Sequence, residues 1–304
     1  MSSRALKNQD YRQERHKYVE WNQTCNRGGI LATLAGKTKV DIVVPCVDIG
    51  AINSALLRDM TILLAQAGVS VVCTVHLEDQ PENLISTIKE TDAAVLPLLP
   101  LDQNTLEQLE QCGATVLDSL MQGKDRQNPA SLMIFQMVKI QVDALAARNR
   151  RNLAFVHWRG KYPEEGATVY YFFAQMACQA AGLSAPTQLV LPEDPENIPS
   201  YLLGALQKHP GLDGFCAIDD MAAMAVVHGL RECGKMVPQD ASVVGGFDSP
   251  SGQVSRPPLS SVVVDTPALA YQELMHIAQR EGDELDLGQA PSGQILQYVA
   301  RESV

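Results

Sequence analysis

Residues 212–262 constrain the fold of this chain more than any other stretch, because they predict two strands joined by a capped helix. Residues 214–218 form an apolar run without polar alternation, which is typical of a strand buried on both faces of a parallel sheet. Asp219 and Asp220 follow this strand, where an aspartate can cap a helix and meets its positive end. A glycine and a proline end the helix before residues 241–244 resume the sheet. The segment is therefore predicted to be a βαβ unit.

The same alternation of strands and helices fills the rest of the chain. Short apolar runs predict strands at residues 40–45, 69–75, 93–99, 114–117, 153–156 and 189–191. Apolar residues at helical intervals predict helices at residues 52–67, 81–90, 101–111, 131–147, 170–181 and 198–208. Two successive runs, split near residue 150, predict an α/β protein with two doubly wound parallel-sheet lobes. A cleft between such lobes is the expected ligand site.

Composition places the chain among ordinary globular proteins. It has 304 residues, of which 46% are hydrophobic and 19% are charged. No apolar run approaches the roughly 18 residues that a membrane span needs, and the amino terminus lacks the apolar core of a secretory signal, so a cytoplasmic location is expected. Seven cysteines without a CxxC pair argue against a disulfide framework and against a zinc site.

The net charge of −11 is unevenly distributed along the chain. Residues 1–39 hold eight Lys or Arg against three acidic residues, a balance of +5, so the remaining chain carries −16. An acidic body does not attract nucleic acid, whereas a short basic arm can contact phosphates. A solvated tail explains the same charge pattern, and charge alone does not decide between the two.

Four motifs in the carboxyl-terminal third occur in a family order. They are Asp-Asp-Met-Ala at 219–222, Gly-Lys-Met-Val-Pro-Gln-Asp-Ala-Ser-Val-Val-Gly-Gly-Phe-Asp at 234–248, Arg-Pro-Pro-Leu-Ser-Ser-Val at 256–262 and Arg-Glu-Ser at 301–303. Together they make the body from about residue 40 to the end resemble the lactose repressor/galactose repressor family of transcription regulators.

The resemblance implies a type I periplasmic-binding-protein fold, usually homodimeric, with a small effector between the lobes. The effector is expected to be a sugar, a sugar derivative or a nucleoside-like molecule. The N-terminal lobe is predicted to comprise residues 40–148 plus about 263–286, and the C-terminal lobe residues 149–262 plus about 287–304. Effector binding would bias lobe closure and so couple ligand to DNA affinity.

Residues 1–39 correspond to a basic arm with the remnant of a headpiece and hinge. Family headpieces are longer than these 39 residues, and the helix that reads base edges has no counterpart here. Operator binding is therefore expected only if a full headpiece exists. The hinge resemblance assigns weak DNA contacts to Arg27, Leu31, Leu34 and Lys37.

The effector site implied by the resemblance departs from the family pattern. Ile218 occupies the place of an asparagine, and Tyr170 that of an arginine, which removes a bidentate cationic donor. Asp118 and Asp248 match positions that often contact hydroxyl groups, although loop and cap carboxylates explain them as well. Asp219 is predicted to be a helix cap more than a ligand.

Three further residues are candidates for the effector site. Trp158 follows a strand and can stack on a ring, while Arg159 supplies a cation; packing of the lobe is the alternative for the tryptophan. Asp48 follows the first strand and is otherwise a turn residue.

The sequence gives little support to an enzyme. Asp48, Asp118 and Asp248 could hold a divalent ion or act as acid and base, but no GxSxG, GxxxxGK[ST], HExxH or GxGxxG motif accompanies them. No cofactor or metal is therefore predicted. The alternative to a regulator is a stand-alone receptor or sensor for a sugar-like molecule that does not contact DNA.

Overall fold

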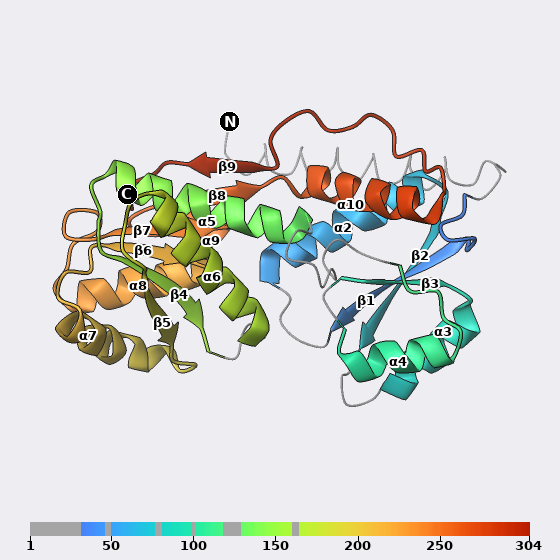
Figure 1. Ribbon diagram of the computed structural model, residues 1–304, viewed down its shortest axis with the longest axis horizontal. Helices are drawn as coiled ribbons and strands as arrows, with labels where there is room; N and C mark the ends of the chain where they lie inside the picture. Colours follow the sequence, from blue (N-terminus) through green and yellow to red (C-terminus); the bar gives the residue numbers. More distant parts are fainter. Residues whose placement is uncertain (1–31, 46–49, 77–80, 99–100, 118–128, 160–163) are drawn as a thin grey trace, which may run out of the picture. The chain divides into compact units, whose positions relative to one another are not determined.

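The computed structural model describes residues 32–45, 50–76, 81–98, 101–117, 129–159 and 164–304. The chain forms two compact units. Unit 1 comprises Met1–Val47, Leu56–Gln122 and Ala270–Pro291, and unit 2 comprises Asp48–Ala55, Gly123–Leu269 and Ser292–Val304. Each unit contains its own parallel sheet, so the predicted α/β class with doubly wound lobes is confirmed (Figure 1).

Unit 1 is built on a three-stranded sheet in the order β2-β1-β3, with both pairs parallel. Its strands are β1 (Lys39–Pro45), β2 (Ser70–His76) and β3 (Ala94–Pro97). Its helices are α3 (Pro81–Thr91), α4 (Gln103–Gln111) and most of α2 (Gly50–Gln66) and α10 (Thr266–Glu281). One face of the sheet carries α3 and α4, whose Leu84, Ile88 and Leu109 bury Val43 and Val95 (Figure 1).

The predicted fourth strand of unit 1 is reduced to one parallel bridge. Val116 pairs with Val95, whose amide donates to the carbonyl of Thr115 at 2.7 Å and whose carbonyl accepts from Leu117 at 2.8 Å. A segment that pairs with the sheet therefore does follow α4, but it is shorter than the strand predicted at residues 114–117.

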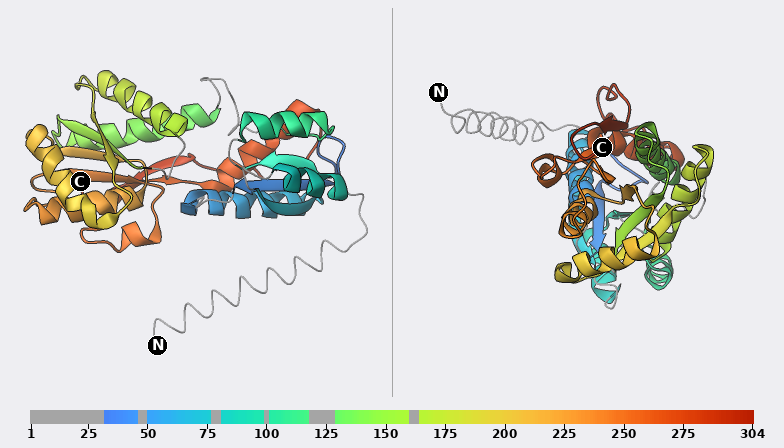
Figure 2. Two further views of the ribbon diagram at one scale, coloured as in Figure 1. Left: turned by 90° about the horizontal axis from the view of Figure 1, so that it is seen from below. Right: turned by 90° about the vertical axis from the view of Figure 1, so that its left-hand side faces the viewer.

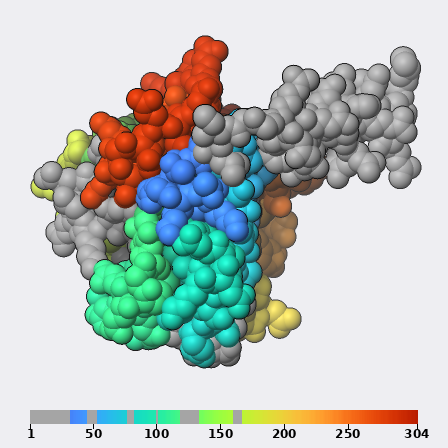
Figure 3. Space-filling model, turned by 90° about the vertical axis from the view of Figure 1, so that its right-hand side faces the viewer, coloured from blue at the N-terminus to red at the C-terminus, as the bar shows by residue number. Residues whose placement is uncertain are grey.

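A tight turn precedes β1 in the described part of the chain. Leu34 and Lys37 exchange two backbone hydrogen bonds, and Ala35 and Gly36 have φ of +53° and +72°. The amide of Ala35 donates to Asp283 at 2.5 Å, so this blue segment lies against the orange-red residues after α10 (Figure 3).

This turn corrects the DNA contact predicted for Leu34, because the Leu34 side chain is fully buried. Lys37, at the other end of the turn, is also a predicted DNA contact, and its ammonium forms an ion pair with Asp92 at 2.5 Å. The other two, Arg27 and Leu31, lie outside the described residues.

Unit 2 is built on a six-stranded sheet in the order β5-β4-β6-β7-β8-β9, in which only β9 is antiparallel to its neighbour. The strands are β4 (Leu153–Trp158), β5 (Thr187–Leu191), β6 (Gly214–Ala217), β7 (Ser242–Gly246), β8 (Ser260–Val264) and β9 (Leu296–Val299). Strands β4, β6 and β7 are buried almost throughout, as a sheet covered on both faces requires.

Helices cover both faces of this sheet. They are α5 (Pro129–Ala147), α6 (Glu164–Ala180), α7 (Ile198–Lys208), α8 (Asp220–Glu232) and the short α9 (Pro250–Gln253). Helices α5 and α6 pack together on one face, and α7 and α8 pack together on the other (Figures 1 and 2). The strand order reverses between β5 and β6, as in doubly wound sheets.

Helix α5 lies in unit 2, which differs from the predicted boundary near residue 150. The buried Gln141 in α5 donates to the carbonyls of Ala217 and Gly245 at 2.8 and 2.9 Å, so it joins the helix to β6 and β7. The boundary therefore lies before α5, between Gln122 and Gly123.

A buried aspartate interrupts the apolar β1. Asp41 is fully buried, and its Oδ2 accepts from the Thr74 hydroxyl at 2.7 Å, while Oδ1 has no partner among the described residues. Burial raises the pKa of Asp41, and the hydrogen bonds from Thr74 offset part of this effect. The ionised carboxylate therefore destabilises unit 1 relative to the unfolded chain.

We expect Asp41→Asn to raise the melting temperature at pH 7 by a few degrees. Because the folded-state pKa is raised, the wild type is most stable below the unfolded pKa of about 3.9 and loses that stability as the pH rises through the folded value. The gain should therefore disappear toward pH 4 in a series of thermal melts. As the matched control, Thr74→Val removes the hydroxyl that donates to Asp41 and should destabilise the protein at pH 7 by about 1–3 kcal/mol. A less stable Asp41→Asn protein at pH 7 would contradict the expectation.

Candidate functional site

Three predicted site segments meet at the carboxyl edge of the unit 2 sheet. Strands β4, β6 and β7 are parallel neighbours and end at Trp158, Ala217 and Gly246. The amide of Ile218 still bonds to the carbonyl of Val156 at 2.9 Å, so the residues that follow β6 stay in line with β4. This is the edge at which open α/β sheets bind ligands.

Asp219 caps helix α8. It has an extended backbone, with φ of −145°, and its Oδ1 accepts from the Ala222 amide at 2.7 Å. The predicted cap is confirmed, and it follows from the local pattern of a carboxylate directly after a strand.

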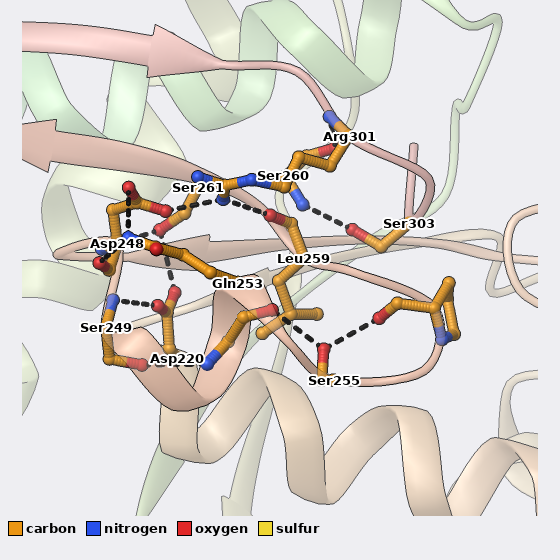
Figure 4. A network of polar contacts seen from close by, with 12 residues as sticks. Asp220, Asp248, Ser249, Gln253, Ser255, Leu259, Ser260, Ser261, Arg301 and Ser303 are labelled. Carbon is orange, nitrogen blue, oxygen red and sulfur yellow. Dashed lines mark hydrogen bonds and ion pairs between the residues drawn. The ribbon is translucent and has the colours of Figure 1, made fainter. Parts of the chain in front are cut away.

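Asp220, the next residue, is enclosed more tightly. Its Oδ1 accepts from the Ser261 hydroxyl at 2.7 Å and its Oδ2 from the Ser249 amide at 2.5 Å (Figure 4). A Cβ added at Gly245 would lie 2.1 Å from Oδ1, and one at Gly252 would lie 2.6 Å from Oδ2. Both glycines are therefore needed for this carboxylate to fit.

Burial is the main cause that raises the pKa of Asp220. The hydrogen bonds from Ser261 and Ser249 act in the opposite direction, and the negative charge of Asp248 raises the pKa further. The sequence predicts that Asp220 lies where a strand ends and a helix begins, but no local pattern indicates its partners, since Ser261 lies 41 residues away.

Asp248 is held by an ion pair. Its Oδ1 accepts from Arg301 Nη1 at 2.5 Å, and its Oδ2 accepts from Gln253 Nε2 at 3.0 Å (Figure 4). Arg301 also donates to the carbonyl of Leu259 at 2.6 Å, and the hydrogen bond to Asp248 raises the pKa of its guanidinium. Phe247 and Asp248 both have positive φ, of +78° and +49°, so the chain turns sharply after β7.

This geometry bears on the role predicted for Asp248. Its two carboxylate oxygens are bonded within unit 2, which makes it a structural group in the described state. In the sequence, Arg301 stands out only as part of the Arg-Glu-Ser motif. Its ion pair with Asp248 is not predictable from local pattern, because the two residues are 53 positions apart.

Trp158 ends β4 with an unpaired polar atom. Its Nε1 is buried and has no hydrogen-bond partner among the described residues. The preceding His157 is fully engaged, since its Nδ1 lies 3.2 Å from the Trp158 carbonyl and its Nε2 lies 3.2 Å from Gln188 Nε2. Burial lowers the pKa of His157, which agrees with a neutral ring that donates through Nδ1 and accepts through Nε2.

Tyr170, on α6, packs against Phe155 of β4. Its ring stacks on Phe155 with centroids 6.3 Å apart and planes 20° apart. Burial, with a smaller contribution from the charge of Asp219, raises the pKa of Tyr170 well above its usual value. The phenol therefore stays protonated and cannot replace the cation that the family pattern has at this position.

The remaining predicted residues divide into three cases. Ile218 has a side chain only 1% exposed and packed in the core, so it reaches the edge through its main chain alone. Arg159 is exposed, and its amide extends the β4–β5 pairing by donating to Leu191 at 3.0 Å. Asp48 and Asp118 lie outside the described residues.

Within the described ranges, no three His, Cys, Asp or Glu residues are grouped so that they could bind a metal ion. The same ranges contain no helix that combines the length and the apolar character needed to cross a bilayer.

The sequence of residues 142–304 matches a known family, described as the periplasmic binding protein-like domain. The chain belongs to this family. The matched region covers β4 to the end of the chain, and so includes the whole edge described above. The resemblance found in the sequence is confirmed for the body of the protein. A search of curated proteins finds no match to this sequence.

Solved structures with the same fold include several transcription regulators. The transcriptional regulator CelR in complex with cellobiose has 17% identity and a TM-score of 0.68, over 91% of this chain and 87% of that one. A LacI family regulator from Silicibacter pomeroyi has 19% identity and a TM-score of 0.66, over 88% and 98%. The Lac repressor bound to ONPG has 14% identity and a TM-score of 0.67, over 92% and 85%. These similarities establish the type I periplasmic-binding-protein fold.

We expect Arg301→Gln to destabilise unit 2 by about 1–3 kcal/mol, because the half-buried Asp248 loses its charged partner. Asp248→Asn should cost a similar amount, and the double variant should cost less than the sum of the two. Urea unfolding of the four proteins measures this cycle.

The matched control for that cycle is Arg231→Gln. Arg231 lies 3.6 Å from Glu232, and both side chains are largely exposed, so its removal should change stability by no more than about 0.5 kcal/mol. Strict additivity of the Arg301 and Asp248 substitutions would show that the two groups do not interact.

Proposed function

We propose that this chain is the effector-binding body of a lactose repressor-type transcription regulator. The observation that carries the proposal is the carboxyl edge of the unit 2 sheet, where Trp158, Asp219 and the turn after β7 follow three neighbouring parallel strands, in a fold shared with such regulators. A small effector would bind at this edge, and its binding would change the affinity of the protein for DNA. The protein would act by binding and not as an enzyme.

Relatives support a small organic effector. One solved structure with this fold is a complex with cellobiose, another is a complex with lactose, and a third is bound to ONPG. For this chain, sugars, sugar derivatives and nucleoside-like molecules are the first compounds to test. The predicted residues Arg159, Asp48 and Asp118 remain candidates for additional contacts.

The effector is expected to raise the thermal stability of the protein. A ligand present at about 100 times its Kd stabilises the folded state by about 2.7 kcal/mol, which gives a shift of several degrees. Differential scanning fluorimetry against sugars, sugar phosphates, nucleosides and small planar compounds tests this, with calorimetry to verify each hit. If no compound of any class shifts the melting temperature, the proposed effector site is wrong.

A homodimer is the proposed assembly, formed through helix α2. Leu56, Met60 and Leu64 of α2 are buried in unit 1, while Leu57 and Leu63, at the two margins of this buried face, stay partly exposed. A second copy of the chain would cover these exposed margins.

We expect the wild-type chain to sediment as a dimer at micromolar concentration and Leu57→Glu to shift it toward monomer, because a carboxylate buried at an apolar interface is unfavourable. Leu203→Glu, at a residue that is 47% exposed on α7 of unit 2, is the matched control and should leave the dimer intact. Circular dichroism checks that both variants are folded. A monomeric wild type, or a dimer that survives Leu57→Glu, would reject this interface.

A stand-alone receptor is the second candidate, and the burial of Leu34 favours it, because a regulator of this type needs its hinge residues free to reach DNA. Selection of bound fragments from a random DNA pool by the full chain separates the two candidates. Enrichment of one sequence supports the regulator, and its absence in a protein that binds an effector supports the receptor.

A further inference from the structure

The amino edge of the unit 2 sheet carries a hollow, at the opposite ends of the strands from the proposed effector site. Three loops surround it, those that lead into the neighbouring strands β4, β5 and β6. Its volume of about 310 Å³ is suited to a small ligand. Side chains that can donate hydrogen bonds line it: Arg151, Asn152, Ser184, Thr187, Lys208 and His209.

The lining of this hollow is positively charged. No acidic residue belongs to it in the described part of the chain, although the protein carries a net charge of −11. Arg151 and Lys208 are exposed, and neither side chain has a hydrogen-bond or ion-pair partner among the described residues. The nearby Asp213 directs its carboxylate to the backbone amides of Arg151 and Asn152, at 2.9–3.2 Å. Two cationic side chains against one carboxylate leave a local excess of positive charge.

Hydrogen bonds fix the loops around the hollow. Asp213 holds the loop before β4 through the backbone bonds just described. The Tyr171 hydroxyl donates to the Pro186 carbonyl at 3.0 Å and so holds the loop before β5. In the loop before β6, the Leu212 amide donates to the His209 carbonyl at 3.1 Å. The backbone that carries the donors is therefore ordered before any ligand binds, which lowers the cost of binding.

Structural roles do not account for all of the basic residues here. Arg150 does have such a role, since its guanidinium donates to the Ser242 hydroxyl at 3.0 Å and to the Gln239 carbonyl at 3.2 Å. Lys208 lies in the last turn of α7, where a cation offsets the helix dipole. Arg151 has neither role, because it lies beyond the end of α5 and its side chain meets no described partner.

We propose that this hollow is a second binding site, for a small molecule that carries a phosphate group. Arg151 and Lys208 would meet the charge of the phosphate, and the other lining donors would bond to its oxygens, which accept several hydrogen bonds each. The acidic body of the protein disfavours a nucleic acid at this position, because a polyanion is repelled by it. The proposal does not depend on the proposed function, since the two sites lie at opposite edges of one sheet.

The first test measures binding by calorimetry in a low-salt buffer. Inorganic phosphate and glycerol 3-phosphate are the probes, and glycerol is the neutral control. We expect both phosphates to bind and Arg151→Gln to weaken them about tenfold, because one charge-assisted hydrogen bond is lost. Lys208→Gln should weaken them as well.

Arg148→Gln is the matched control for this test. Arg148 is an exposed arginine of the same basic segment, and it does not line the hollow, so its removal changes the net charge equally and should leave the affinity nearly unchanged. An equal loss in the Arg148 and Arg151 variants would show only a general effect of charge and would overturn the site. The absence of binding by either phosphate would also overturn it.

The second test locates the ligand on the wild-type protein. Acetylation of lysines, followed by mass spectrometry, should modify Lys208 several times more slowly when glycerol 3-phosphate is present, and Lys235, exposed outside the hollow, at an unchanged rate. Arg151→Gln should abolish this protection. If a DNA duplex protects Lys208 and the phosphates do not, the hollow contacts nucleic acid and the proposal is wrong.

The outcomes also separate the ligand sources and the two sites. Tighter binding of glycerol 3-phosphate than of inorganic phosphate supports an ester as ligand, and equal affinities support the free anion; either result agrees with the proposal. A phosphate that binds equally well to the Arg151 and Lys208 variants occupies another site, which rejects this one and leaves the effector site untouched.

Discussion

The enclosed carboxylate of Asp220 is the interaction on which the carboxyl edge of unit 2 depends. It joins the first turn of α8 to Ser249 before α9 and to Ser261 in β8, and it fits only because Gly245 and Gly252 lack side chains. Burial of this group without its hydrogen bonds would be costly, so these segments must keep their relative positions. The edge is therefore rigid where β7 and β8 contribute to it.

The carboxyl-terminal residues extend the same network. Ser303 accepts from the Ser260 amide and donates to the carbonyl of Val243, so it links β8 to β7, and Arg301 pairs with Asp248 beside them. The polar groups that a sugar-binding edge would present are thereby used to hold the fold together. The indole N–H of Trp158 is the polar atom at the end of β4 that has no partner among the described residues.

Local patterns predicted the elements of both units well. The strand before Asp219 and the cap at Asp219 follow from neighbouring residues, and so do most helices and strands up to β7. The assignment of α5 to a unit failed, because its apolar residues show that it is buried but not against which sheet; Gln141 and its bonds to β6 and β7 decide that. The DNA contact predicted for Leu34 was wrong for a similar reason. A short apolar stretch is compatible both with a hinge that contacts DNA and with a buried turn, and the Leu34 side chain is buried.

The sequence by itself determined the fold class, the family and the cap at Asp219, because periodicity, capping and motif order act over a few residues. Only the tertiary structure decided which polar groups of the edge are free. Asp248 meets Arg301 across 53 residues and Asp220 meets Ser261 across 41, and no local pattern encodes such pairings. The structure also decides the position of Ile218, which stands in place of an asparagine: its side chain is buried in the core and only its main chain reaches the edge.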